Sequence, residues 1–274
     1  NMDGAPDFAV VTATGTVNKV YLGDPLDLEA DNFGVDALGG LKHWDLGTRT
    51  DDSTSIEAVD LDGDGIKETL IVGNRGAPDE LFYWPTAPNG ETGIVRVPFA
   101  GSDDTEDVAA IKRTPTSTVI TVVFAKSDGA SGLEDTFSTL TIGTTRPSGT
   151  IAVSTLPGAK KRHTHSVHFH LVDSGLGTGT DTGVLIAHLY TGFNNHGTAH
   201  TELGQYFGND GTDTIVSGTD IERDGVLDAV AEQGIRKLTT GAFDANGPPN
   251  VVLTTNGGTV LIVTGELTGG TVPS

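Results

Sequence analysis

The sequence predicts an all-β protein, a β-propeller built from four-stranded antiparallel blades, and three observations support this prediction. The 38 glycines and 12 prolines make up 50 of the 274 residues and are spread along the chain, as in proteins with many turns. Short apolar runs of strand length recur, whereas no segment shows the 3.6-residue apolar period of an amphipathic helix. A nine-residue pattern followed by an apolar run recurs at spacings of roughly 47 to 61 residues, which suits one blade per repeat.

The composition excludes several classes of protein. The chain has 37 acidic and 16 basic residues, which gives a formal net charge of −21. A surface this acidic repels nucleic acids and anionic lipids, so we expect no nucleic-acid partner and no direct membrane insertion. The lack of cysteine excludes disulfides and thiolate metal sites, and the acidic excess indicates solubility, cation binding or both. Because the sequence begins at Asn1 instead of Met, we interpret it as a processed chain or a fragment.

One acidic segment defines the repeated pattern. Residues 60–68 read Asp-Leu-Asp-Gly-Asp-Gly-Ile-Lys-Glu and lead into the β-type run 69–72. Acidic side chains at positions 1, 3, 5 and 9 of a tight loop supply the oxygen ligands that Ca²⁺ prefers, and glycine at position 6 allows the sharp turn. Without a cation, four acids in nine residues repel one another. The expected calcium ligands are Asp60, Asp62, Asp64, the carbonyl of Ile66, and Glu68.

Two further segments follow the same pattern. Residues 220–228 predict a second calcium site, with the ligands Asp220, Glu222, Asp224, the carbonyl of Val226, and Asp228. The chain opens within a third copy, with the ligands Asn1, Asp3, the carbonyl of Ala5, and Asp7. Position 1 of that copy would lie upstream of Asn1. We therefore expect two Ca²⁺ sites, and a third if upstream residues complete it.

Three more segments match the pattern weakly. Segment 173–181 keeps the acids at both ends but has glycines at positions 3 and 5, so we expect an ordinary glycine turn there. Segment 112–120 has no acid, and the Lys112 ammonium at position 1 either replaces the cation or is solvated. Segment 242–250 begins only 22 residues after the preceding copy, so we interpret it as a turn within the last blade.

The five main copies divide the chain into a single propeller domain, 1–274, with approximate blades 1–59, 60–111, 112–172, 173–219 and 220–274. The expected strands are 8–13, 17–22, 43–46 and 56–59; then 70–72, 81–84, 94–97 and 108–111; then 119–125, 137–142, 151–156 and 167–172; then 184–189, 201–207 and 214–216; and finally 227–231, 236–243, 251–255 and 260–264. Five blades are expected, with six or seven as alternatives.

An acidic loop followed directly by a strand resembles the FG-GAP/VCBS repeat family, the calcium-loop propellers of integrin α-subunit heads and of secreted microbial and fungal lectins. The matching segments are 60–72 and 1–11, the latter with its partner strand 17–22. The resemblance implies calcium as a stabiliser of the fold, an extracellular location, and binding or adhesion. The chain departs from the family in size, because those propellers usually have seven blades. An EF-hand is disfavoured, since no helix flanks the loops.

Histidines form the other notable cluster. Six of the eight lie between 163 and 196, namely His163, His165, His168, His170, His188 and His196. His168 and His170 are two residues apart and share one face of a strand, which is a geometry found in transition-metal sites. The other interpretation is that they line a wet sheet face or a subunit contact.

Two classes of function follow from these patterns. The first is a secreted, calcium-stabilised propeller that acts as a binding, adhesion or surface-assembly module, lectin-like or part of a filament. Its partner would be a carbohydrate, a protein surface or another copy of itself, which would complete the site at Asn1 or add a strand. The alternative is a polysaccharide-active lyase or hydrolase that uses the histidine cluster, although no catalytic residue can be chosen and we favour a non-enzymatic role.

Overall fold

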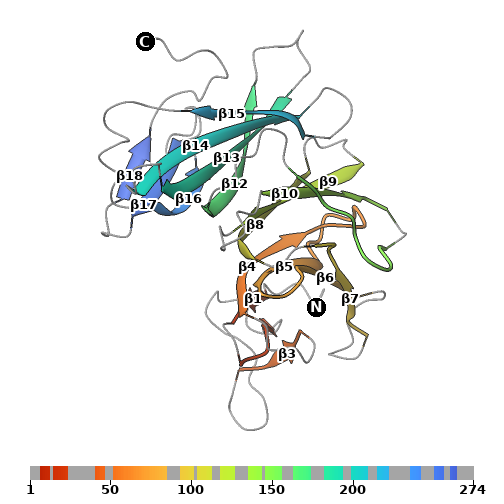
Figure 1. Cartoon of the computed structure of the whole chain (residues 1–274). Helices are drawn as coiled ribbons and strands as arrows, with labels where there is room; N and C mark the ends of the chain where they lie inside the picture. Colours follow the sequence, from red (N-terminus) through yellow and green to blue (C-terminus); the bar gives the residue numbers. More distant parts are fainter. Residues whose placement is uncertain are drawn as a thin grey trace. The chain divides into compact units, whose positions relative to one another are not determined.

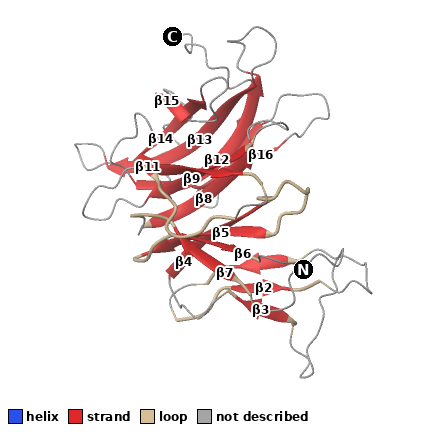
Figure 2. Ribbon diagram, turned by 90° about the vertical axis from the view of Figure 1, so that its right-hand side faces the viewer, coloured by secondary structure: helices blue, strands red, loops and turns tan. Residues whose placement is uncertain are grey.

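The computed structural model of the chain describes its backbone over most of the expected strands. The described residues are 7–12, 15–23, 41–46, 52–84, 93–101, 104–112, 118–126, 135–143, 146–155, 163–173, 182–193, 199–208, 215–221, 235–241, 250–255 and 260–263. Side chains are described up to residue 155, except that of Ile111, and beyond it only at Val252 and Val260. Every regular element in these ranges is a strand, so the all-β prediction is confirmed (Figure 2). Within them, no helix is long and apolar enough to cross a membrane.

The described strands form five sheets, each made from consecutive strands of the chain (Figure 1). The first sheet contains β1 (Phe8–Val10), β2 (Lys19–Tyr21) and β3 (His43–Asp45). The second contains β4 (Asp52–Val59), β5 (Thr69–Arg75), β6 (Glu80–Tyr83) and β7 (Val95–Pro98). The third contains β8 (Thr105–Lys112), β9 (Val119–Lys126), β10 (Thr136–Thr141) and β11 (Ser154–Thr155). The fourth contains β12 (His163–Asp173), β13 (Thr182–Phe193), β14 (Ala199–Gly208) and β15 (Ile215–Ile221), and the fifth β16 (Ile235–Gly241), β17 (Asn250–Thr255) and β18 (Val260–Val263).

The boundaries between sheets differ from the expected boundaries between blades by one strand. The strands expected to end the first three blades, 56–59, 108–111 and 167–172, instead begin the next sheet. Thus β4 pairs with β5, with Val59 opposite Thr69, and β12 pairs with β13, with Asp173 opposite Thr182. The physical reason is seen at loop 60–68, which reverses the chain tightly enough to close the antiparallel hairpin of β4 and β5 and so lies within a sheet and not between two sheets.

The chain divides into two compact units. One comprises Asn1–Val108 and Leu140–Val153, and the other Ala109–Thr139 and Ser154–Ser274. The division runs through the sheet β8–β11, which contains residues of both units. The acidic loop 60–68 belongs to the first unit.

The β4–β7 sheet is buried on both of its faces, and this makes it the centre of the first unit. On one face, Leu70, Val72 and Phe82 pack in a cluster with Val20 and Trp84. On the other face, Ile71 is opposite Leu81, which is opposite Val97, and all three are buried. Burial on two faces explains why strand β5 reads as a continuous apolar run and not as an alternating one.

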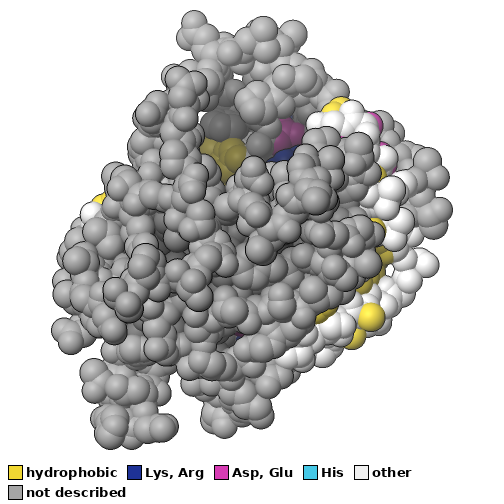
Figure 3. All heavy atoms as spheres, turned by 90° about the horizontal axis from the view of Figure 1, so that it is seen from above, with side chains coloured by type: hydrophobic (Ala, Val, Ile, Leu, Met, Phe, Trp, Pro, Cys, Tyr) yellow, Lys and Arg dark blue, Asp and Glu magenta, His cyan; other side chains and the backbone are white. Residues whose placement is uncertain are grey.

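Few large hydrophobic side chains are exposed on the described surface. Those that are exposed are Phe8, Leu41, Ile66 and Val260. Seen from above, the described hydrophobic side chains that are visible lie beside backbone atoms and other side chains (Figure 3).

A chain of buried polar groups crosses the first unit. The Asn18 amide donates to the Ser53 hydroxyl at 2.8 Å, and this hydroxyl donates to the Asn74 side-chain oxygen at 2.6 Å. The Asn74 backbone N–H donates to one carboxylate oxygen of Asp79 at 2.8 Å, and the Thr105 hydroxyl donates to the other at 2.7 Å. Asp79 is 0 % exposed, so these hydrogen bonds replace the water that its carboxylate loses on folding.

The same arrangement occurs in the second unit. Asp135 directly precedes β10, as Asp79 precedes β6, and it accepts a hydrogen bond of 2.8 Å from the backbone N–H of Lys126 at the end of β9. Both aspartates are almost fully buried. Two successive sheets thus each use a buried aspartate to close the hairpin between their second and third strands.

We predict that Gly73→Ala destabilises the first unit by about 1–3 kcal/mol, the usual cost of overpacking. An added Cβ would lie 2.7 Å from Cγ2 of Thr105, well inside contact distance. Thr105→Ser removes that methyl group and keeps the hydroxyl that donates to Asp79. Chemical denaturation should therefore show that the double variant is less destabilised than the sum of the two single changes. Strict additivity would contradict the predicted clash.

Candidate metal centre

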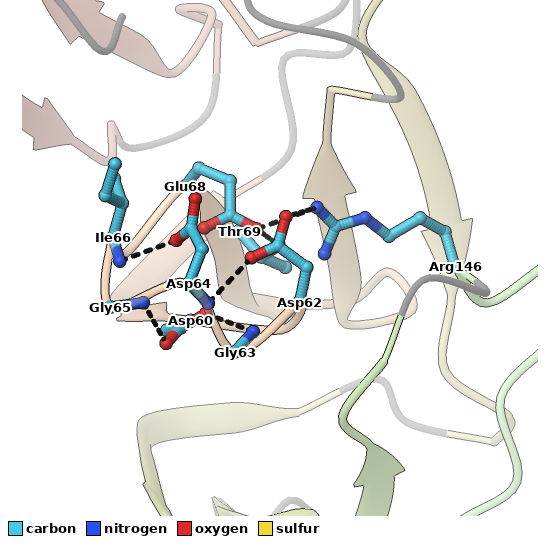
Figure 4. A network of polar contacts seen from close by, with 9 residues as sticks. All are labelled: Asp60, Asp62, Gly63, Asp64, Gly65, Ile66, Glu68, Thr69 and Arg146. Carbon is cyan, nitrogen blue, oxygen red and sulfur yellow. Dashed lines mark hydrogen bonds and ion pairs between the residues drawn. The ribbon is translucent and has the colours of Figure 1, made fainter.

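Loop 60–68 joins β4 to β5, and its own acidic side chains hold its backbone (Figure 4). Asp60 accepts two hydrogen bonds, from the backbone N–H of Gly63 at 2.6 Å and of Gly65 at 2.8 Å. Asp64 likewise accepts from the N–H of Ile66 at 2.8 Å, and Asp62 accepts a longer bond of 3.2 Å from the N–H of Asp64. The three aspartates therefore have defined positions before any ligand is considered.

Two glycines make this turn sterically accessible. Gly63 has a φ of 84° and Gly65 a φ of 92°, in the left-handed region that other residues rarely adopt. Gly65 is the position-6 glycine of the predicted pattern, so its expected role in the turn is confirmed. Gly63 is the fourth residue of the pattern. The predicted pattern does not specify which residue occurs there, so the need for glycine at this position was not predicted.

Four of the five predicted ligand residues come together. One ligand oxygen each from Asp60, Asp62, Asp64 and Glu68 lies within 4.8 Å of all the others. Oxygens bound to one Ca²⁺ at 2.3–2.6 Å can be at most about 5 Å apart, so this spacing fits a common cation. The carbonyl of Ile66, the fifth predicted ligand, stays a prediction.

Glu68 differs from the three aspartates because it is buried. Its side chain is only 5 % exposed, and Oε2 has no hydrogen-bond partner among the described residues. The pKa of Glu68 is raised above its ordinary value, and burial is the largest cause. A hydrogen bond to its own backbone lowers the pKa, the charge of Asp62 raises it, and the charge and hydrogen bond of Arg146 lower it, but the net effect is a rise. An ionised carboxylate with a free oxygen is costly in such a place unless a cation neutralises it.

Arg146 is the site residue that sequence reasoning missed. Its Nη2 lies 2.8 Å from Oδ2 of Asp62 and 3.0 Å from Oε1 of Glu68. The guanidinium also lies 5.9 Å from the ring centre of Tyr83, whose hydroxyl donates to the Pro147 carbonyl at 3.0 Å. No sequence signal joins Arg146 to a loop 84 residues earlier, because only the fold brings the two segments together.

The third predicted calcium site is only partly within the described residues. Asn1, Asp3 and Ala5 lie outside them. Asp7 directly precedes β1, and its Oδ1 accepts a hydrogen bond of 2.9 Å from the backbone N–H of Gly23. This bond ties Asp7 to Gly23, two residues after the partner strand β2, and the role of Asp7 as a calcium ligand stays a prediction.

The second predicted calcium site and the histidine pair lie in the part where side chains are not described. Asp220 is in β15, opposite Gly204, while Glu222, Asp224, Val226 and Asp228 lie outside the described residues. His168 and His170 occupy alternate positions of β12, opposite Ala187 and Leu185 of β13. The strand expected at these histidines is therefore confirmed, and their binding of a transition metal stays a prediction.

Comparisons with known proteins identified neither a matching protein-family model nor a matching curated protein. The resemblance to calcium-loop propellers thus rests on the residues of the loops.

We predict that Glu68→Gln leaves the metal-free melting temperature at least as high as that of the unchanged protein. The amide has no charge to desolvate, and its oxygen can still accept a hydrogen bond from Arg146. Glu57→Gln on β4, in the same hairpin but outside the acidic cluster, is the matched control. The measurement is thermal unfolding in a chelator. A loss larger than about 1 kcal/mol in Glu68→Gln alone would show that the charge of Glu68 stabilises the fold without metal.

Proposed function

We propose that the chain is a calcium-stabilised β-propeller that acts as a binding, adhesion or surface-assembly module. One observation carries this proposal: four carboxylates surround a common point, and one of them, Glu68, is buried with an oxygen that has no partner among the described residues. An acidic turn that served only solubility would leave its carboxylates in water.

The chemistry of the loop favours calcium over other metals. All four ligand groups are carboxylates, and the chain has no cysteine, so soft metals that prefer sulfur are poorly suited. Mg²⁺ usually keeps several of its waters and binds one or two carboxylates. Four carboxylates on one nine-residue loop match the larger coordination number of Ca²⁺.

The position of the loop favours a structural role for the ion. The loop joins two strands of the doubly buried sheet, and Leu61 within it is 0 % exposed. The Leu61 carbonyl accepts a hydrogen bond of 3.1 Å from the backbone N–H of Gly143. A cation that stabilises the turn therefore also stabilises the hairpin β4–β5 and the segment that packs against it.

The arrangement of strands supports the propeller. Consecutive segments of the chain form five antiparallel sheets of three or four strands within the described residues. The β4–β7 sheet is buried on both faces, as is a blade that lies between two neighbours. We propose that the five sheets are five blades of one domain, 1–274, with six or seven blades as alternatives.

The binding role and the location extend this proposal. The resemblance of loop 60–68 to the loops of extracellular calcium-loop propellers favours an extracellular location, where Ca²⁺ sites have Kd values of about 10⁻⁴–10⁻³ M. We therefore propose a secreted or cell-surface protein whose partner is a carbohydrate, a protein surface or a second copy of the chain. The alternative, a polysaccharide-active lyase or hydrolase, relies on the histidine cluster, whose side chains lie outside the described ones, and it stays a prediction.

We predict that Ca²⁺ raises the melting temperature and that Asp64→Asn removes most of this rise. At a hundredfold excess over Kd, an ion bound only by the folded state contributes about 2.7 kcal/mol, or roughly 5–10 °C for a protein of this size. Asp45→Asn, an acid in an ion pair with Lys19 on the first sheet, is the control and should keep the full response. The measurement is differential scanning calorimetry with calcium and with a chelator. An equal response in both variants would rule out this loop as the site.

We also predict that small-angle X-ray scattering gives a radius of gyration of about 19 Å, the value for a compact 274-residue domain. A closed propeller is one compact body, whereas a chain of the same length without such closure would give a larger radius of gyration. A value above about 24 Å for the monomer would contradict the single-domain propeller.

A further inference from the structure

The guanidinium of Arg146 already places a positive charge next to the acidic loop. Arg146 contacts two of the four proposed metal ligands, Asp62 and Glu68, through a single nitrogen, Nη2. In Figure 4 it reaches the loop on the side of Asp62, while Gly65 and Ile66 lie on the opposite side. Its side chain is 15 % exposed, so this charge is largely removed from water and acts on the loop at close range.

One guanidinium does not balance the charge of this loop. Four ionised carboxylates and one arginine leave a net charge of −3, and a divalent cation would reduce it to −1. The ion pair is also incomplete in its hydrogen bonds. Oε2 of Glu68 and Nη1 of Arg146 are both buried without a partner among the described residues. The contact with Arg146 thus neutralises only part of the negative charge of the loop. The remaining negative charge still attracts a second cation.

Arg146 contributes little to the orientation of the aspartates. Asp60, Asp62 and Asp64 each accept a hydrogen bond from a backbone N–H of the loop itself. Arg146 takes the second oxygen of Asp62 and pairs with Oε1 of Glu68, which also has a long 3.4 Å contact with the Thr69 hydroxyl. The main effect of Arg146 on a cation bound here is therefore its positive charge, which repels that cation.

We propose that Arg146 is a tethered counter-cation that competes with the divalent ion at this loop. It stabilises the loop when metal is absent, and it weakens metal binding. Ion binding and the contact of Arg146 with Asp62 and Glu68 oppose each other, so metal loading loosens the arginine. This inference rests on the proposed function, because it concerns regulation of the same site.

The surroundings of Arg146 define which part of the chain would respond. The Ile151 backbone N–H donates to the Pro98 carbonyl at 2.9 Å, and the Ile151 carbonyl accepts from Ala100 at 2.7 Å. These bonds hold Ile151 to the end of β7 independently of the loop. When the contact of Arg146 with the loop loosens, residues 146–147 should become more mobile, and the hydrogen bond from Tyr83 to Pro147 should weaken. The backbone hydrogen bonds of Ile151 should stay in place.

The experiment compares Arg146→Gln, Arg146→Lys and the unchanged protein by calcium titration calorimetry and by thermal unfolding in a chelator. We expect Arg146→Gln to unfold at a lower temperature without metal and to bind Ca²⁺ about tenfold more tightly, since a nearby unit charge opposes a divalent ion. Arg146→Lys keeps the charge and should bind close to the original affinity. Arg96→Gln, which breaks an ion pair with Glu80 away from the loop, is the control for general destabilisation and should leave the calcium affinity unchanged.

The outcomes separate this inference from the proposed function. If the unchanged protein binds calcium and Arg146→Gln binds equally or more weakly, Arg146 positions ligands and the competition is refuted, while the calcium site stands. If no variant binds calcium, both ideas fail. Lower metal-free stability together with tighter calcium binding in Arg146→Gln would support competition. If Arg146 had only a structural role, its replacement would lower both the stability and the calcium affinity.

Discussion

Repulsion among the four carboxylates of loop 60–68 is the constraint on which the stability of the first unit depends. Asp60, Asp62, Asp64 and Glu68 are held within a few ångströms of one another by a turn that their own backbone hydrogen bonds define. The turn closes the hairpin between β4 and β5, and every residue of β5 except Arg75 is buried. Charge on the loop therefore acts directly on the core, and any cation that neutralises it stabilises that sheet. Arg146 supplies part of this neutralisation, and we propose that a calcium ion supplies more of it while opposing the contact with Arg146.

Buried polar groups, and not only apolar contacts, connect the elements of this unit. The chain of hydrogen bonds from Asn18 through Ser53 and Asn74 ends at Asp79, a carboxylate without solvent exposure whose partners satisfy both of its oxygens. Asp79 and Glu68 illustrate two ways to place an acid in a core. The first is complete hydrogen bonding within the protein, and the second leaves an oxygen free for a ligand. Only the second suggests a binding site. The net charge of −21 thus includes acids with internal roles as well as those of a solvated surface.

Much of this could be predicted from the sequence, and the remainder has a physical explanation. The all-β class followed from turn residues and strand-length apolar runs, and the clustering of Asp60, Asp62, Asp64 and Glu68 followed from their spacing, because both signals are local. The pairing of β4 with β5 was misassigned, since a run of residues identifies a strand without identifying its neighbour. Arg146 could not be found for a related reason: its partners are 84 residues away, and only the fold brings them together. Asp79 is an ordinary turn residue in the sequence, and only the structure shows that its carboxylate is buried.

The most direct test of the central claim is an anomalous diffraction map from crystals grown with calcium, or with manganese as a substitute. We predict one strong peak at the loop, about 2.3–2.6 Å from carboxylate oxygens of Asp60, Asp62, Asp64 and Glu68 when the ion is calcium. Glu68 should bind it through the oxygen that has no described protein partner, and Arg146 should lie farther from Asp62 than the present 2.8 Å. A map without a peak at this loop at millimolar calcium, with Arg146 still paired to both acids, would contradict the claim.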